Sequence, residues 1–318
     1  MVGAFAVAAV CAGLMGFAIQ RGGTCLVAAI DEVVSKRRAN RLLALGEASL
    51  LVAAGMVAAQ LLGILPMAPR AFAITGWTVL GGMIMGLGAY VAGACVFGAI
   101  ARIGNGEPAY FLVPLGFFLG CIAALRLGMD RLPHSVAAHS PVLADALIFA
   151  GPLLLLVSWR LGRLAYFARR RELLSHVWSP HVATGVIGVT FVILFCAVGA
   201  WNYTDYLAEA ARHMGSRLSD RGLLLLALFG GALLGGWTAR RIKPVRPTVA
   251  AIARCLAGGI MLGLGGSLVP GANDGLILLG LPLLYPHAWV AFASMLLTIA
   301  AALLVQQRAA MARKPGLA

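Results

Sequence analysis

Long apolar stretches alternate with short polar ones along the chain. A membrane-spanning helix needs about 20 predominantly apolar residues, and its backbone must satisfy its own hydrogen bonds in lipid. The pattern therefore predicts about nine transmembrane helices in a single all-α integral membrane domain over residues 1–318. Their predicted ranges are 3–20, 42–65, 76–92, 108–127, 142–160, 181–200, 222–239, 250–269 and 284–306.

Basic residues gather in four short clusters between the apolar stretches, at Lys36–Arg41, Arg160–Arg171, Arg240–Arg246 and Arg308–Lys314. Cytoplasmic loops of membrane proteins are enriched in Lys and Arg. All four clusters can be cytoplasmic if an even number of helices separates neighbouring clusters, and the predicted helices satisfy this condition. The net charge of +14 is then explained by orientation in the membrane, and we expect no nucleic-acid partner.

Composition supports the membrane assignment and argues against several kinds of site. With 61% apolar and 11% charged residues, the chain has more apolar surface than a soluble core of this size can bury. The six cysteines are scattered singly, so neither a disulfide framework nor a metal site is predicted. The sequence carries no nucleophile elbow or phosphate loop, so we predict neither an enzyme nor a bound cofactor.

The two halves of the chain resemble each other. The segment Gly81–Gly88 is similar to Gly258–Gly265, and the same offset places Gly98 on Gly275. The predicted topology gives the two copies opposite orientations, as in transporters built from two inverted structural repeats. We expect residues 1–160 and 181–318 to form the halves and 161–180 a basic cytoplasmic linker; chance similarity between glycine-rich helices is the alternative.

Three stretches rich in glycine and polar residues interrupt the apolar pattern, at 20–25, 92–108 and 270–275. Irregular backbone is tolerated at membrane depth only where protein or a wet cavity surrounds it. Short re-entrant helices after such breaks would point free N–H groups inward, where they favour an anion. Each stretch alone could be an interfacial turn, but together they favour a substrate path.

Ionisable residues near these breaks are functional candidates, because charge is costly within a membrane. Arg21 can form a structural ion pair or bind substrate. Glu107 can cap a helix, and Asp274 can accept hydrogen bonds from loop amides. Glu47, early in a predicted helix, can extend its carboxylate to the membrane surface or pair with Arg41.

Cys25 and Cys95 differ from the other cysteines because each sits beside glycine at a predicted helix break. A thiol is a weak hydrogen-bond donor with a polarizable sulfur atom. The remaining cysteines lie within apolar stretches, where we expect them to pack as small side chains: Cys11, Cys121, Cys196 and Cys255.

At these residues the chain resembles the YeeE/YedE family of bacterial membrane proteins, which carry thiosulfate and related sulfur compounds. One similar feature is Gln20-Arg21 followed by Cys25. The second is a glycine-rich helix followed by a cysteine, an arginine and a Gly-Glu element, here Gly86, Gly88, Gly93, Cys95, Gly98, Arg102, Gly106 and Glu107. The resemblance covers most of the chain and implies a multi-pass protein of the bacterial inner membrane.

The resemblance implies that a small sulfur anion such as thiosulfate passes between thiols through S–H···S contacts. The substrate path would include Cys25, Cys95, Gln20, Arg21, Gly93, Ala272 and Asn273, and residues for gating or coupling would be Arg102, Glu107 and Asp274. A cytoplasmic sulfur-carrier, rhodanese-like or regulatory protein is a possible partner.

The second half departs from the family pattern. Where the family has Gly-Cys-Asn, this chain has Gly271-Ala272-Asn273, and the stretch 202–205 also lacks cysteine. Three explanations are open: a different substrate, an outer gate built from amides such as that of Asn273, or a membrane sensor that signals to a cytoplasmic regulator.

Overall fold

The chain is an all-α membrane protein, as predicted. The computed structural model describes residues 2–67, 69–136, 140–169, 177–212, 218–243 and 245–312. Within these residues, eight segments are helical, long and apolar enough to cross a membrane. Their long helices are α1 (Val2–Gly22), α3 (Asn40–Leu61), α4 (Gly76–Ala92), α6 (Leu112–Arg126), α9 (Pro180–Val198), α11 (Leu218–Thr238), α12 (Val249–Leu268) and α14 (Pro286–Ala312).

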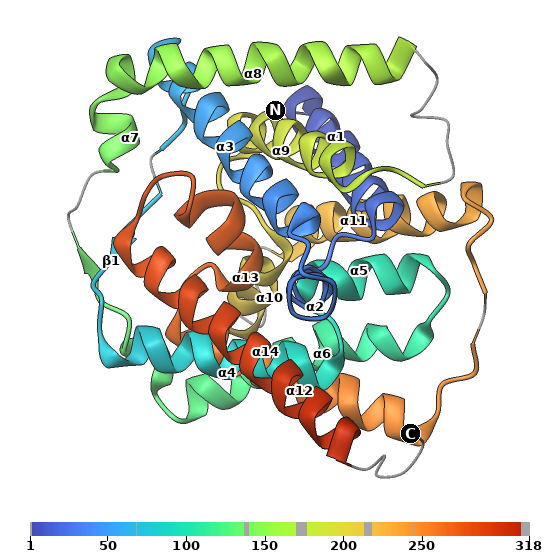
Figure 1. Cartoon of the computed structure of the whole chain (residues 1–318). Coiled ribbons are helices and arrows are strands. Elements are labelled where there is room, and N and C mark those ends of the chain that lie inside the picture. Colours follow the sequence, from blue (N-terminus) through green and yellow to red (C-terminus); the bar gives the residue numbers. More distant parts are fainter. Residues whose placement is uncertain are drawn as a thin grey trace.

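Four of these long helices are followed by a backbone break and a short helix. The short helices after α1, α4, α9 and α12 are α2 (Leu26–Lys36), α5 (Val96–Gly104), α10 (Tyr203–Arg212) and α13 (Ala272–Gly275). A π-helical turn, Leu276–Gly280, extends α13. Figure 1 shows α2, α10 and α13 near the centre of the view, enclosed by the long helices.

Small elements complete the described fold. The 3-10 turns Pro108–Phe111 and Met129–Arg131 lie on either side of α6. The strands β1 (Ala71–Phe72) and β2 (Ser135–Val136) pair antiparallel, with Ala71 opposite Val136.

Helix α8 (Ala146–Arg169) occupies the predicted fifth span and lies along the outside of the molecule, after the short α7 (Pro141–Ala144) (Figure 1). Its apolar part, Ala146–Arg160, is shorter than the eight spans. The nine-helix count therefore stays a prediction. The helix continues into the predicted linker as far as Arg169, and residues 170–176 of that linker lie outside the described residues.

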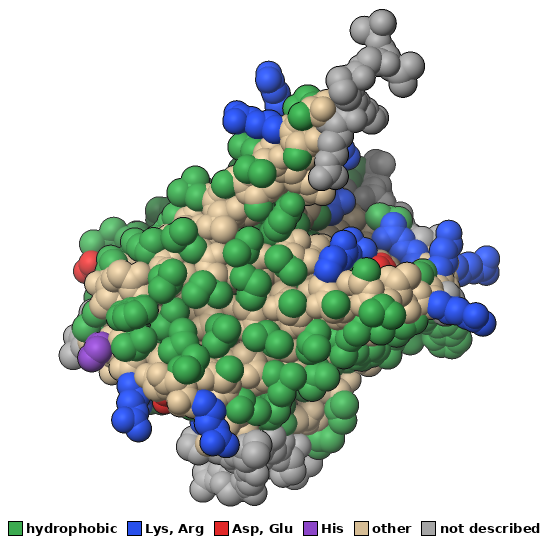
Figure 2. Space-filling model, turned by 90° about the horizontal axis from the view of Figure 1, so that it is seen from below, with side chains coloured by type: hydrophobic (Ala, Val, Ile, Leu, Met, Phe, Trp, Pro, Cys, Tyr) green, Lys and Arg blue, Asp and Glu red, His purple; other side chains and the backbone are tan. Residues whose placement is uncertain are grey.

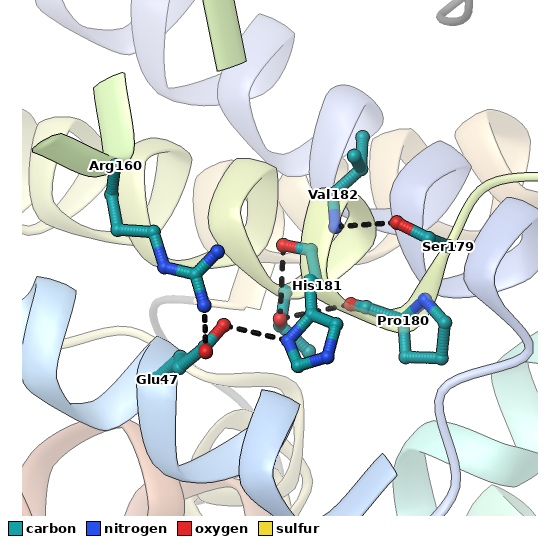
Figure 3. Close-up of polar contacts among 7 residues, drawn as sticks. Glu47, Arg160, Ser179, Pro180, His181 and Val182 are labelled. Carbon is teal, nitrogen blue, oxygen red and sulfur yellow. Dashed lines mark hydrogen bonds and ion pairs between the residues drawn. The ribbon is translucent and has the colours of Figure 1, made fainter. Parts of the chain in front are cut away.

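An ion-pair cluster attaches α8 to the helices beneath it. The carboxylate of Glu47 on α3 pairs with Arg160 on α8 and lies 2.8 Å from Nδ1 of His181 on α9 (Figure 3). The expectation that Glu47 pairs with Arg41 was wrong, because Arg41 instead donates from its backbone N–H to Glu32 and from its guanidinium to the carbonyl of Gly23.

Apolar side chains cover much of the surface. Figure 2 shows one face on which they occupy the broad middle, while Lys and Arg side chains gather toward its margins. Exposed large side chains include Leu147, Leu155, Trp237 and Leu297, each at least 70% exposed. In a water-soluble protein such a surface would aggregate; in a bilayer it contacts acyl chains.

Helices α4 and α12 cross in close antiparallel contact. A Cβ atom added at Gly88 would lie 2.7 Å from the carbonyl oxygen of Gly258, and one added at Gly81 would lie 3.0 Å from that of Gly265. The reciprocal distances, for Cβ atoms at Gly258 and Gly265, are both 2.6 Å. Small residues allow membrane helices to approach this closely, so packing between backbones holds the crossing together.

Replacing Gly88 with alanine is expected to destabilise the protein by about 2 kcal/mol or more, because the added methyl overpacks backbone that has no flexible neighbour to move. The measurement is thermal unfolding of detergent-purified protein followed by size exclusion. Gly76→Ala in the same helix is the matched control, since nothing lies within 4 Å of a Cβ there. Equal melting temperatures for the two variants would contradict the close crossing.

Candidate functional site

The breaks after α1 and α4 bring Cys25 and Cys95 together. Each cysteine precedes the first residue of a short helix and has an extended backbone, which places its side chain beside the free N–H groups of that helix. The backbone N–H of Leu26, the residue after Cys25, donates to Sγ of Cys95 at 3.1 Å, and the two thiols influence each other electrostatically. Cys95 is fully buried, whereas Cys25 is half-buried.

The thiol of Cys25 rests on the backbone of α5 at Gly98. A Cβ added at Gly98 would lie 2.5 Å from Sγ of Cys25, so any side chain there would displace the thiol. Cys25 also lines a small pocket with Thr24, Arg41 and Thr184. Gly93, which ends α4 with φ of 71°, lies just before Cys95 and gives the chain its sharp turn.

Gln20 and Arg21 connect the first break to neighbouring helices. Nε2 of Gln20 donates to Oδ1 of Asn105 at 2.9 Å, and the guanidinium of Arg21 donates to Oγ1 of Thr238 at 2.7 Å. Arg21 also stacks on Phe17, with 4.9 Å between its guanidinium carbon and the ring centroid. Both side chains are buried. These contacts position the break, and direct contact with substrate stays a prediction.

Arg102 and Glu107 form an ion pair of 3.0 Å at the other end of α5. Glu107 occupies the capping position directly before the turn Pro108–Phe111, as predicted, although its side chain makes no capping hydrogen bond there. The guanidinium of Arg102 lies 5.0 Å from the centroid of the Tyr110 ring. These three residues line an open pocket together with Arg246 and Arg254, giving it a positive balance.

The break after α12 places a polar amide where the family resemblance implies a thiol. Gly271 and Ala272 both have positive φ, 92° and 42°, which is unusual for alanine. Asn273 is 0% exposed, and neither its Oδ1 nor its Nδ2 has a hydrogen-bond partner among the described residues. A buried amide without partners costs roughly 1–3 kcal/mol, which indicates that a ligand or water is expected there.

Asp274, the next residue, is held by α10. Its carboxylate accepts from the backbone N–H of Thr204 at 3.4 Å and from the Thr204 hydroxyl. The neighbouring carboxylate, Asp205, accepts from Nδ2 of Asn202 at 2.7 Å. Asp274 therefore accepts from an amide, as one interpretation expected, but that amide belongs to helix α10 and not to a loop.

Both carboxyls lie outside the eight membrane-spanning segments; Asp274 is buried inside the protein and Asp205 is half-buried. Burial raises the pKa of Asp274 to about 7, and it also raises the pKa of Asp205. The hydrogen bonds from Thr204 oppose this effect at Asp274, while the nearby charge of Asp205 adds to it. Asp274 can therefore change protonation near neutral pH.

The two sets of breaks touch each other. The hydroxyl of Tyr203, at the start of α10, donates to the carbonyl of Val96, directly after Cys95, at 3.2 Å. Helix α13 also contacts α5. Trp201, just before α10, is buried, and its indole N–H has no partner among the described residues. The sequence alone did not assign Trp201 or Tyr203 to the site, because the residues around them look like those of an ordinary outer loop.

These features define a class: a polytopic α-helical membrane protein whose broken helices bring thiols and unpartnered hydrogen-bond donors to a common interior. Such an arrangement suits the passage of a small anion, because each group offers a weak, replaceable contact. Comparison with known proteins agrees with this class. The chain belongs to the sulphur transport family, whose model matches residues 21–301. It is accordingly a membrane transporter for sulfur compounds and not an enzyme.

Two characterised relatives share most of their length with this chain. It is 23% identical to the thiosulfate transporter TsuA of Escherichia coli strain K12, over 91% of both proteins. It is 24% identical to the thiosulfate transporter TsuA of Spirochaeta thermophila, over 87% of this chain and 92% of the relative.

Proposed function

We propose that this protein transports thiosulfate across the bacterial inner membrane, along a path through the junction of the two sets of helix breaks. The observation that carries the proposal is the contact between α5, which begins directly after Cys95, and α13, which carries the unpartnered amide of Asn273. The names of the two relatives support thiosulfate as the substrate.

The sulfur end and the oxygen end of thiosulfate each suit a different group of side chains where the two sets of helix breaks meet. Its terminal sulfur is soft and accepts weak S–H···S hydrogen bonds, which suit the thiols of Cys25 and Cys95. Its three oxygens accept N–H hydrogen bonds, which suit Nδ2 of Asn273 and the indole N–H of Trp201. In this proposal the second half binds oxygen where the first half binds sulfur, so a cysteine in place of Ala272 is dispensable.

We further propose that the path lies on the axis of an inverted repeat. The crossing of α4 and α12 supports this, because Gly81 meets Gly265 while Gly88 meets Gly258. Reciprocal contacts of this kind are expected where equivalent segments meet across a two-fold axis. Two further pairings agree: α6 packs on α12 as α14 packs on α4, and α1 packs on α11 as α3 packs on α9.

The test is uptake of radiolabelled thiosulfate into liposomes that contain the purified protein. We expect uptake well above that of protein-free liposomes, and we expect excess unlabelled thiosulfate to suppress it. Sulfate has no terminal sulfur, so it should compete weakly. Strong competition by sulfate would overturn the role assigned to the thiols.

Sensing is the alternative that the missing second-half cysteine suggests. It predicts thiosulfate-dependent thermal stabilisation with no uptake, and that combination would replace transport as the conclusion. The cytoplasmic partner suggested by the family resemblance stays a prediction.

A further inference from the structure

Asp274 and Asp205 lie at the second set of helix breaks, through which the proposed anion path runs. Among the described residues neither carboxylate takes part in an ion pair. Asp274 is 1% exposed, and its polar contacts come from Thr204. Two charged carboxylates in a buried site repel each other and repel any anion that reaches the adjacent amide of Asn273.

The titratable groups around the two carboxyls offer little compensation. The Tyr203 phenol faces Asp274 from α10. Asp205 feels Arg212 and Glu209, both on α10, and Cys121 on α6. Arg212 is exposed at the end of its helix, and its charge acts on Asp205 and Cys121 but is not among the groups that act on Asp274.

We propose that Asp274 binds the proton that accompanies each anion through the second break, which makes this protein a proton-coupled transporter. The proposal rests on the proposed function and adds its source of energy. The unpartnered amide of Asn273, the residue before Asp274, is the anion-binding group in this proposal. Protonation of Asp274 removes the repulsion, so the anion binds when the proton is bound. The anion is released toward the inside when the proton leaves.

Coupling of this kind has a physical purpose. A divalent anion entering a cell moves against a membrane potential that is negative inside. A proton that travels with it reduces the charge moved and adds the energy of the pH gradient. The pKa of Asp274, raised by burial to about 7, allows the carboxyl to load and unload between the two sides of such a membrane.

The experiment measures radiolabelled thiosulfate exchange in proteoliposomes at equal inside and outside pH, from pH 8 to pH 6. Wild-type exchange is expected to rise about tenfold as the protonated fraction of one group with a pKa near 7 increases. Asp274→Asn carries no titratable carboxyl there, so its exchange should be nearly independent of pH. An imposed gradient, acidic outside, should drive accumulation in the wild type and not in this variant.

Two further variants keep the test decisive. Thr204→Val removes a hydrogen bond that lowers the pKa of Asp274, so the midpoint of the pH profile should move to higher pH. Asp31→Asn makes the same substitution at an exposed carboxylate bonded to Ser35, and it should leave the profile unchanged.

Each outcome is informative. Exchange with a flat pH profile in the wild type would overturn proton coupling and leave thiosulfate transport standing. A pH profile that persists in Asp274→Asn, or that does not shift in Thr204→Val, would overturn the role of Asp274. Absence of exchange at every pH would overturn the proposed function and the coupling together.

Discussion

Replacing Cys95 with alanine is expected to lower thiosulfate uptake about 100-fold, the scale on which removal of one preorganised donor to a desolvated anion acts. Cys95 is 0% exposed and contacts both Cys25 and the first N–H of α2. A substrate sulfur that reaches this point has few other soft partners, so loss of the thiol interrupts the path. Uptake into proteoliposomes measures the effect.

Two matched variants separate transport from folding. Alanine leaves the N–H of Leu26 without its acceptor, which costs roughly 1–3 kcal/mol, whereas Cys95→Ser keeps an acceptor at the same place. We expect the serine variant to fold like the wild type and to transport poorly, because oxygen is a harder atom than sulfur. Cys11→Ala, in the middle of α1 and away from the breaks, should transport normally. Wild-type uptake in Cys95→Ser would contradict a role for sulfur.

The membrane-spanning helices could be predicted because lipid imposes a length and a composition on each of them. The apolar stretch 76–92 coincides with α4, and 250–269 differs from α12 by one residue at each end. The breaks near Cys25 and Cys95 were also visible, since glycine and polar residues interrupt apolar runs there. In each case the determining interaction is local in sequence.

The remaining parts depend on contacts between distant residues. Helix α10 is polar enough to be taken for an outer loop, and only its hydrogen bonds to Asp274, 70 residues away, show that it packs inside the protein. Glu47 was assigned to the nearby Arg41, whereas its partner is Arg160 on α8. An offset of 177 residues carries Gly98 onto Gly275 and also Cys25 onto Asn202, which agrees with the stretch 202–205 that the family pattern indicates.

Asn273→Leu is expected to abolish transport and to make the protein more stable. Leucine has the same branched heavy-atom skeleton as asparagine but no polar atoms, so it removes two buried hydrogen-bonding atoms that have no partner among the described residues. Ending that desolvation cost should raise the free energy of unfolding by about 1–2 kcal/mol. Uptake should fall roughly 100-fold, because the proposed anion-binding site loses its hydrogen-bond donor to the substrate oxygens.

The opposite signs of these two effects distinguish a functional amide from a structural one. A structural asparagine would lose stability and uptake together on substitution, since its partners would be left unsatisfied. Asn40→Leu, at an exposed position in the first turn of α3, is the matched control and should change neither quantity. Thermal unfolding and proteoliposome uptake measured on the same preparations give both numbers. A less stable Asn273→Leu protein would show that the amide has partners in the folded state. The anion-binding site of the second half would then have to be sought at Trp201 or Asn202.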